Sequence, residues 1–252
     1  MNDFRYALKR AFRLAEDSAS HEEIKKRILS GGQVTGTNMC VLICAILIAS
    51  VGLNTNSTAV IIGAMLISPL MGSILAMAYG VASADSHQLK RNIYGFIIQL
   101  TISLLVSTVY FLLSPVNEAS SELMARTQPT LYDVIIATAG GFAGIIGSTR
   151  HDKVNNIIPG VAIATALMPP VCTCGYSIAH AEWQMLSGAA YLFIVNCYFI
   201  FLSAMLILDI LNIPKVSTLT DKQWKRIKKK MIRNAVIVLI PSIVFTYLML
   251  TD

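Results

Sequence analysis

Between Arg27 and Asp85 the chain reads ILSGGQVTGTNMCVLICAILIASVGLNTNSTAVIIGAMLISPLMGSILAMAYGVASA, without one Asp, Glu, Lys, Arg or His. A helix that spans a bilayer needs about 20 apolar residues. This stretch is therefore long enough for two spans, and the polar run at residues 54–58 separates them. The core of a water-soluble domain could hold one such run, but the chain continues with several more.

The rest of the chain follows the same pattern. Of its 252 residues, 55% are hydrophobic and 13% are charged, roughly half of the ~25% charged residues of a soluble domain. The sequence predicts an all-α integral membrane protein of about seven transmembrane helices. The first thirty residues hold no apolar signal-peptide core, so we expect the first span to direct insertion. The expected spans are residues 36–53, 58–81, 92–113, 131–149, 157–179, 186–208 and 234–250.

Basic residues alternate along the predicted loops. Arg126 is the one Lys or Arg of twenty that lies outside the N-terminal segment, the loops after the second and fourth spans, and the segment after the sixth. Cytoplasmic loops of membrane proteins are enriched in Lys and Arg. The sequence therefore predicts a multi-pass protein of the cytoplasmic (inner) membrane of a prokaryote, with the N-terminus in the cytoplasm and the C-terminus outside.

Two basic segments, residues 1–35 and 209–233, are expected at the cytoplasmic face. Apolar residues at helical spacing in residues 3–15 predict an amphipathic surface helix, and Ser20 with Glu23 predicts the cap of a second helix that stops at Gly31 and Gly32. Residues 220–233 show a similar apolar face. These segments either set topology and anchorage, or bind anionic lipid or a partner. The residues expected at anionic lipid are Lys225, Arg226, Lys228, Lys229 and Lys230.

The second and fifth predicted spans contain similar motifs. Residues 63–72 read GAMLISPLMG and residues 160–170 read GVAIATALMPP. With Gly63 set against Gly160, Ser68 meets Thr165, and the breakers Pro69 and Gly72 fall beside Pro169 and Pro170. Each motif lies in the middle helix of a three-helix group, residues 36–113 and 131–208, and the charge pattern gives the groups opposite topology. This predicts a 3+3 inverted repeat, followed by an extra helix at residues 234–252 with Pro241 inside.

Such repeats with interrupted helices are typical of secondary transporters. Proline removes a backbone hydrogen bond, and inside a membrane the freed groups are tolerated only in protein or in a wet cavity. The freed groups can then hold a ligand, although kinks also serve packing alone. The residues expected to bind a substrate or ion are Asn54, Asn56, Ser57, Ser68, Pro69, Gly72, Thr165, Pro169, Pro170 and Thr173.

Other polar and small residues allow two interpretations. Residues 54–58 form either a turn with a helix cap or a polar tip near the breaks. Gln99 and Asn196 are candidates for hydrogen bonds between helices. A glycine stripe on the fourth span permits a close approach within one protomer or in a homo-oligomer. The stripe consists of Gly140, Gly141, Gly144 and Gly147.

The charges and motifs that the sequence lacks narrow the range of possible functions. No Asp, Glu, Lys or Arg falls at mid-membrane depth, which argues against a proton pump with a central carboxylate. The chain has no Walker loop, no Rossmann glycine pattern and no His-Glu-x-x-His. The five cysteines fall in apolar segments and are interpreted as packing residues. We expect no enzymatic activity, no cofactor, no metal and no nucleic-acid partner.

At both motifs the chain resembles a prokaryotic membrane family, the domain of unknown function family 389, also called the uncharacterised hydrophobic domain family. The resemblance covers roughly residues 36–208 and rests on residues 56–72 and 158–170, with residues 148–155 matching the preceding loop. It differs at Ser73, where the family typically has proline. The resemblance implies a prokaryotic membrane protein and supplies no activity.

The sequence thus leads to three hypotheses. The first is a secondary transporter that moves a small solute or ion by alternating access at the two breaks. The second is a passive channel that uses the same broken helices. The third is a membrane scaffold or sensor that acts through its basic cytoplasmic helices.

Overall fold

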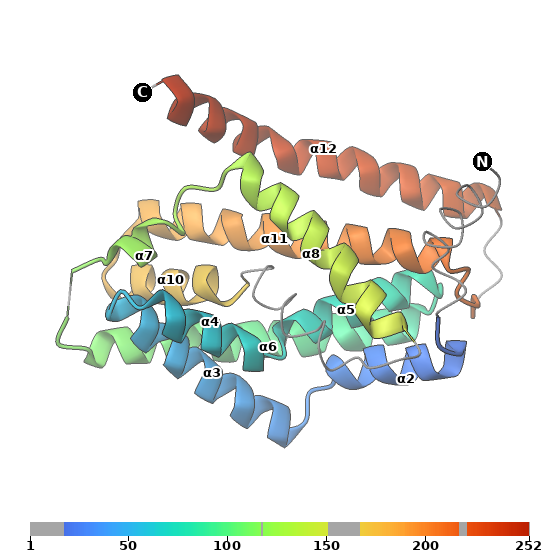
Figure 1. Cartoon of the computed structure of the whole chain (residues 1–252), viewed down its shortest axis with the longest axis horizontal. Coiled ribbons are helices and arrows are strands. Elements are labelled where there is room, and N and C mark those ends of the chain that lie inside the picture. Colours follow the sequence, from blue (N-terminus) through green and yellow to red (C-terminus); the bar gives the residue numbers. More distant parts are fainter. Residues whose placement is uncertain (1–17, 117, 151–166, 217–220, 252) are drawn as a thin grey trace, which may run out of the picture.

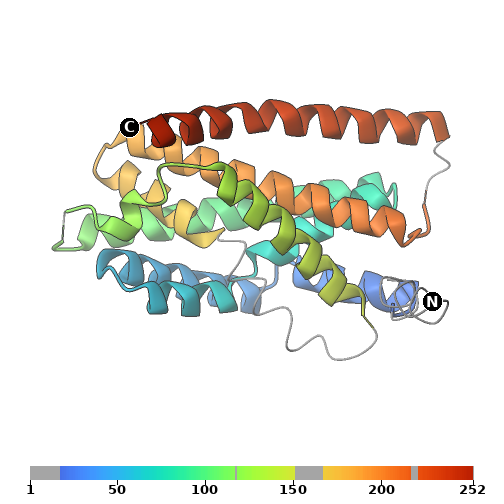
Figure 2. The same cartoon turned by 45° about the horizontal axis from the view of Figure 1, so that its top comes forward.

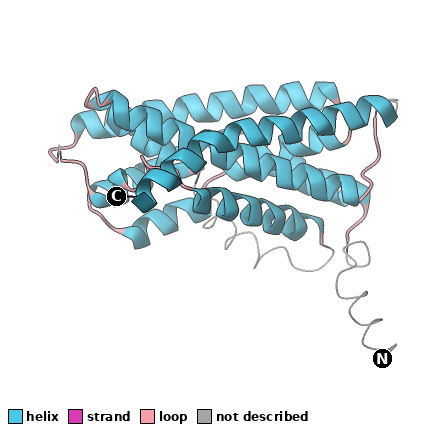
Figure 3. Cartoon of the chain, turned by 90° about the horizontal axis from the view of Figure 1, so that it is seen from above, coloured by secondary structure: helices cyan, strands magenta, loops and turns pink. Residues whose placement is uncertain are grey.

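The computed structural model describes residues 18–116, 118–150, 167–216 and 221–251, and their regular structure is helical (Figure 3). The predicted surface helix at residues 3–15 and the residue Thr165 lie outside these ranges. The helices are α2 (His21–Gly31), α3 (Gly36–Asn54), α4 (Thr58–Ile67), α5 (Leu70–Ala82), α6 (Ser86–Leu113), α7 (Ser121–Met124), α8 (Leu131–Thr149), α10 (Met168–Ala179), α11 (Trp183–Ile210) and α12 (Asp221–Thr251).

Four helices in the described residues are long and apolar enough to cross a membrane, namely α3, α6, α8 and α11. The bent pair of α4 and α5 makes a fifth if it counts as one span. The predicted spans at 36–53 and 131–149 agree with α3 and α8 to within one residue. Helices α6 and α11 have 28 residues each, about 42 Å at 1.5 Å per residue, and so extend beyond a hydrocarbon core of about 30 Å.

The outer surfaces of these helices are apolar. Large hydrophobic side chains are exposed along α6, α8 and α12, among them Ile97, Leu105, Leu112, Ile135, Ile136, Val236, Ile237 and Ile240. Soluble monomers rarely expose contiguous apolar patches of more than a few hundred Å². A surface of this kind is matched to lipid, so the chain is a membrane protein.

Most helices run along the length of the molecule (Figures 1 and 2), with α4 and α5 following each other in one direction and α6 returning in the other. Helix α8 crosses α11, and α12 lies against both on the outside (Figure 1). The α8–α11 crossing depends on Gly141, because a Cβ there would lie 2.0 Å from Ser203 Oγ and 2.8 Å from Ile200 Cα. At Gly141 the glycine stripe therefore serves a contact within one protomer, the first of the two interpretations.

Helix α2 packs onto α5 and the end of α8. It begins as predicted, with Ser20 Oγ accepting a hydrogen bond from the Glu23 N–H, and it ends at Gly31. Ile24 and Ile28 are buried, and the Ala19 N–H donates to the Thr149 carbonyl. This helix is thus part of the packed structure.

Helix α12 joins two segments that we had expected to be separate, the end of residues 209–233 and the extra helix at residues 234–252. Its 31 residues run continuously from Asp221 through Pro241. Its amphipathic start docks on the end of α11, where Trp224 is buried and its Nε1–H donates to Asp209 at 2.7 Å. Lys228 Nζ bonds the other oxygen of Asp209 at 2.6 Å.

We predict that Gly141→Ala destabilises the protein by roughly 1–3 kcal/mol, the usual effect of overpacking, because the new Cβ would lie 2.8 Å from Ile200 Cα. The measurement is the thermal unfolding midpoint in detergent. Gly63→Ala is the matched control, since a Cβ at Gly63 meets nothing within 4 Å. An equal loss in both variants would contradict the α8–α11 contact.

Candidate functional site

The second membrane segment is broken between Ile67 and Leu70. Helices α4 and α5 meet there at an angle of 44°. Pro69 has no N–H to continue the ladder, and Ser68, which precedes it, is extended with ψ 128°, as residues before proline tend to be. The Leu70 N–H is within 3.4 Å of Ser68 Oγ. The predicted break is therefore present, and the hydroxyl of Ser68 caps its second half.

A cavity of about 200 Å³ lies against this break. Three elements line it: the break itself, the end of α2 and the end of α8. At about 30 Å³ per water molecule, this volume suits a small solute or a partly hydrated ion. The polar and small lining residues are Arg27, Gly31, Ser68, Gly72, Gly144 and Ser148.

Gly72 has a packing role at this cavity. A Cβ at Gly72 would lie 2.2 Å from the carbonyl oxygen of Gly31 and 2.5 Å from its carbonyl carbon. Both atoms are backbone and cannot move aside cheaply. Gly72, one of the predicted binding residues, is thus the position at which α2 closes against α5.

Arg27 brings a positive charge to the cavity. Its Nη1 donates to the carbonyl of Arg150, just past the end of α8, at 2.5 Å, and its Nη2 pairs with Glu23 one turn earlier in α2. A cation near a helix C-terminus is favourable because the helix dipole is negative there. Arg27 therefore already supplies a cation to the carbonyl end of α8.

A polar stripe runs along the buried face of α6. Asn92 donates to the Ala76 carbonyl of α5 at 2.8 Å, and Ser107 donates to the Cys172 carbonyl of α10 at 3.0 Å. Between them, Ser73 Oγ of α5 donates to Gln99 Oε1 at 2.7 Å. Helix α6 thus makes polar contacts with both α5 and α10.

Gln99 has an unsatisfied amide. The residue is completely buried, and its Nε2 has no hydrogen-bond partner. A buried donor without a partner costs about 1–3 kcal/mol. Such a group calls for an explanation, and a bound ligand is one.

Helix α10, like α5, is too short to cross a hydrocarbon core of about 30 Å alone, and we call these two helices half-helices. The 12 residues of α10 span about 18 Å, and it starts with Met168, Pro169 and Pro170. Proline suits the first turn of a helix because the N–H groups there have no intrahelical partner. Thr173, another predicted binding residue, donates back to the Pro169 carbonyl at 3.0 Å.

The two half-helices start near the middle of the molecule. Figures 1 and 2 both show α5 and α10 beginning there and running to opposite ends. Pro69, Pro169 and Pro170 thus lie at the starts of these helices. The starts are the positive ends of their dipoles.

The polar run at residues 54–58 lies elsewhere. Asn54 Nδ2 donates to Ser114 Oγ at 2.6 Å, and Asn56 Oδ1 accepts from the Glu122 N–H at 3.1 Å. The Ser57 N–H bonds the Gly52 carbonyl at 2.8 Å. The ten residues of α4 place this turn about 15 Å from the break. The predicted binding residues therefore lie in separate places in the structure. That Asn54, Asn56 and Ser57 bind a ligand stays a prediction.

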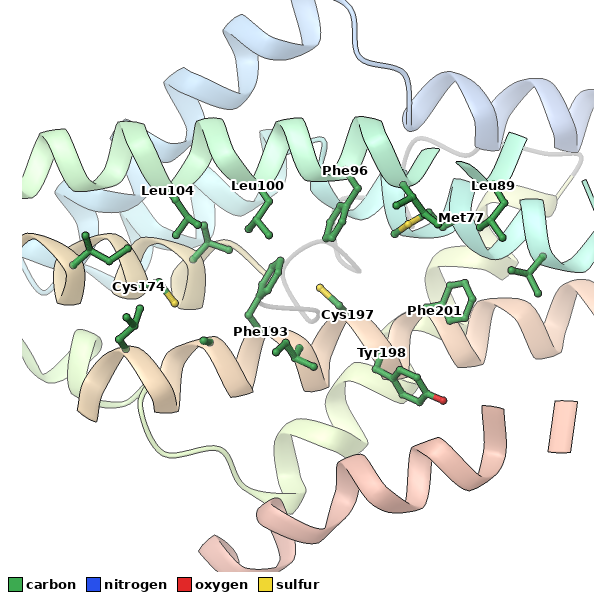
Figure 4. Close-up of a pocket in the computed structure, with 17 residues that line it drawn as sticks. Met77, Leu89, Phe96, Leu100, Leu104, Cys174, Phe193, Cys197, Tyr198 and Phe201 are labelled. Carbon is green, nitrogen blue, oxygen red and sulfur yellow. The ribbon is translucent and has the colours of Figure 1, made fainter. Parts of the chain in front are cut away.

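An apolar groove of about 680 Å³ runs between α6 and α11 (Figure 4). Phe96 and Phe193 stack across it with ring centroids 6.1 Å apart. Cys174 and Cys197 line it beside these rings, whereas Cys40 and Cys44 are exposed. Its lining offers almost nothing polar to hold a solute.

Sequence analysis missed one residue of the cavity, Arg27, and it missed the contact of Ser73 with Gln99, a residue to which it gave only a packing role. The available signal was the recurrence of polar residues at helical spacing in an apolar segment, namely Asn92, Gln99, Ser103 and Ser107. Ser73 was noted only as a departure from the resembled family. Arg27 gave no signal, because its place depends on how α2 packs.

The chain belongs to a family known as Domain of unknown function (DUF389), whose model matches residues 65–202. This range includes the break, Gln99 and α10. A relative from Methanocaldococcus jannaschii, named Uncharacterized protein MJ0678, is 27% identical over 189 residues, which cover 75% of this chain and 57% of the relative. The chain thus spans little more than half of that relative's length. No solved structure matches the chain.

We predict that Gly72→Ala loosens α2 from α5, because the added methyl group meets the Gly31 carbonyl. The expected result is faster tryptic cleavage after Lys25, Lys26 or Arg27, about tenfold if the variant weakens docking by about 1.4 kcal/mol. Gly36→Ala is the control, since its Cβ meets nothing within 4 Å. Unchanged cleavage in Gly72→Ala would contradict this contact.

Proposed function

We propose that the protein is a secondary transporter that moves a small solute or ion across the membrane by alternating access at two broken helices. The observation that carries the proposal is the break at Ser68 and Pro69 with a cavity of about 200 Å³ against it. In a bilayer, irregular backbone is tolerated only where it is buried in protein or lines a wet cavity. Transporters use such sites for their substrates.

The proposal includes a 3+3 inverted repeat, residues 36–113 and 131–208, within about seven spans. Two features support it. Helices α3 and α8, which open the two groups, run in opposite directions (Figure 1). The half-helices α5 and α10 also run oppositely and start with similar motifs.

We also propose that the protein lies in the cytoplasmic (inner) membrane of a prokaryote, with α2 and the start of α12 on the cytoplasmic side. Lys90 and Arg91 near the start of α6 and Lys228 in α12 support this orientation, because cytoplasmic loops are rich in basic residues. With neither an enzyme motif nor a central carboxylate in the sequence, we propose transport without enzymatic activity or a resident cofactor.

The test is saturable uptake of solutes into proteoliposomes, compared between the unmodified chain and Pro69→Ala. Restoring the N–H at residue 69 lets α4 and α5 join into one helix, so we predict that uptake falls at least tenfold. Pro241→Ala is the matched control, since Pro241 also lies among apolar residues, in the second half of α12, but away from the cavity.

Two outcomes would contradict this proposal. Equal uptake by Pro69→Ala and the unmodified chain would show that transport does not depend on the break. Unitary conductance steps in planar bilayers, without saturation, would favour a passive channel.

A second proposal concerns the start of α12. Lys225, Arg226, Lys229 and Lys230 are exposed, whereas Lys228 pairs with Asp209. We infer that the four exposed residues bind anionic headgroups, each contributing about 1 kcal/mol, and that Lys228 instead anchors α12 to α11.

This proposal predicts that changing the four exposed residues to Gln reduces the anionic lipid that copurifies with the protein, as counted by native mass spectrometry. Lys228→Gln should leave the lipid count unchanged and lower the unfolding temperature. If the fourfold variant kept its anionic lipid, the exposed residues would serve only topology and anchorage.

A further inference from the structure

We propose that the groove between α6 and α11 binds the acyl chain of an anionic phospholipid, whose headgroup lies at the membrane face where α6 begins. This lipid site is separate from the cavity at the break, and it does not depend on the transport proposal. Two features of the groove carry the inference. Its walls suit a hydrocarbon chain, and basic side chains flank one of its ends.

The walls of the groove are apolar. Helices α5, α6, α10 and α11 supply them, with Phe96 and Phe193 facing each other across the groove (Figure 4). Tyr198 brings a hydroxyl group, but that group donates to the Met231 carbonyl of α12 at 2.6 Å. A polar solute would lose its hydration here and gain almost no hydrogen bonds in return. A hydrocarbon chain needs none.

The groove is open to the lipid and long enough for one acyl chain. Ile93, Ile178 and Ile194 line it and are themselves exposed, so a chain can enter from the side. Along α6 the groove reaches from Leu89 to Leu104, about 22 Å at 1.5 Å per residue. One leaflet accounts for roughly half of a hydrocarbon core of about 30 Å. The groove can therefore hold an acyl chain over the full depth of a leaflet.

Lys90 flanks the end of the groove where α6 begins. It is exposed, follows Leu89 directly and lies three residues before Ile93, both of which line the groove. Residues three apart on a helix are surface neighbours, and a lysine side chain can extend along apolar surface with its charge in the headgroup region. Arg91 is also exposed, but it lies two residues from both Leu89 and Ile93 and therefore on the opposite side of α6.

Lys215 brings a second positive charge to this end. The next residue, Val216, donates its N–H to the Ser83 carbonyl at 2.8 Å. Ser83 follows α5 directly, and Val81 in the last turn of α5 lines the groove. Lys215 is exposed, with its Nζ 4.6 Å from the centroid of the Trp224 ring. The segment after α11 thus places a lysine beside the same mouth that Lys90 flanks.

The acidic groups at this end already have partners. Asp85 caps the start of α6 by accepting a backbone N–H, and Asp209 pairs with Lys228. Among the described residues, neither Lys90 nor Lys215 forms an ion pair. This end therefore attracts a negative charge, and a membrane supplies one at this depth in the phosphate of an anionic lipid.

The same charges decide between a lipid and a second copy of the chain. In a two-fold symmetric dimer the same surface patch of both copies meets. With the symmetry axis along the membrane normal, Lys90 and Lys215 of one copy would face the same residues of the other and repel them. At the opposite end of the groove, Glu182 precedes α11, which also favours a phosphate at the end where α6 begins.

The test is native mass spectrometry of the delipidated full-length chain, titrated with phosphatidylglycerol and separately with zwitterionic phosphatidylcholine. We expect a saturable phosphatidylglycerol site with at least tenfold higher affinity than phosphatidylcholine. Ala190→Phe, which places a ring in the groove, should weaken phosphatidylglycerol binding at least tenfold. Ala59→Phe is the matched control and should bind as the unmodified chain does, since Ala59 is exposed on α4, outside the groove.

Lys90→Gln tests the position of the headgroup. It should weaken phosphatidylglycerol binding about fivefold, the effect of one basic residue near an anionic surface, and leave phosphatidylcholine within twofold. Arg91→Gln removes the same charge from the opposite side of α6 and should stay within twofold for both lipids. Equal losses in the two variants would overturn the headgroup position. The exposed basic residues of α12 are kept in every variant, so their effect is the same throughout.

A photoreactive lipid maps the site without any substitution. Phosphatidylglycerol with a diazirine on its acyl chain should crosslink between Leu89 and Leu104 and between Leu186 and Phe201, and excess unlabelled lipid should suppress these crosslinks. Crosslinks spread evenly over α3, α8 and α12, or undiminished by the competitor, would overturn the inference. A dimer that Ala190→Phe dissociates, without a saturable lipid, would assign the groove to a second copy and likewise overturn it.

Discussion

The constraint on which the structure depends is the lack of water for backbone groups inside a bilayer. Pro69 interrupts a membrane helix, and the groups that it frees need partners from the protein. Ser68 Oγ approaches the Leu70 N–H, α2 covers the break through Gly31 and Gly72, and α8 closes the other side. The same constraint makes the break a candidate site, since electrostatic interactions are stronger inside a protein than in water.

Much of the fold could be predicted because helices that span a membrane are long apolar runs, which are easy to recognise in a sequence. The span of α8 follows from its apolar length, and the start of α2 follows from the cap at Ser20. The break at Ser68 and Pro69 followed from proline chemistry. Contacts between helices could not be predicted in this way, since the sequence alone left open whether Gly141 contacts its own protomer or another one. Only the packed structure shows Ser203 and Ile200 of α11 against it.

Part of the candidate site could also be predicted from local sequence. Ser68, Pro69 and Gly72 were identified from a local motif, and they line one cavity. Asn56 was grouped with them because it is polar and close in sequence, yet α4 carries it a helix length away. The unpaired amide nitrogen of Gln99 could not be predicted from the sequence, because it depends on which residues of α5 pack against α6.

The placement of α2 has a consequence for the proposed alternating access. This helix contacts α5 through Gly31 and α8 through the bond from Arg27 to the Arg150 carbonyl, so it joins elements of both three-helix groups across the cavity. If the groups rock against each other, the end of α2 has to part from one of them. The Gly31–Gly72 contact is backbone against backbone and offers no flexible side chain. The attachment to α8 is made by hydrogen bonds that water can replace, from Arg27 to the Arg150 carbonyl beside a partly exposed ion pair and from the Ala19 N–H, just before α2, to the Thr149 carbonyl. If the proposed alternating access takes place, we therefore expect α2 to move with α5 and the cavity to open on the α8 side.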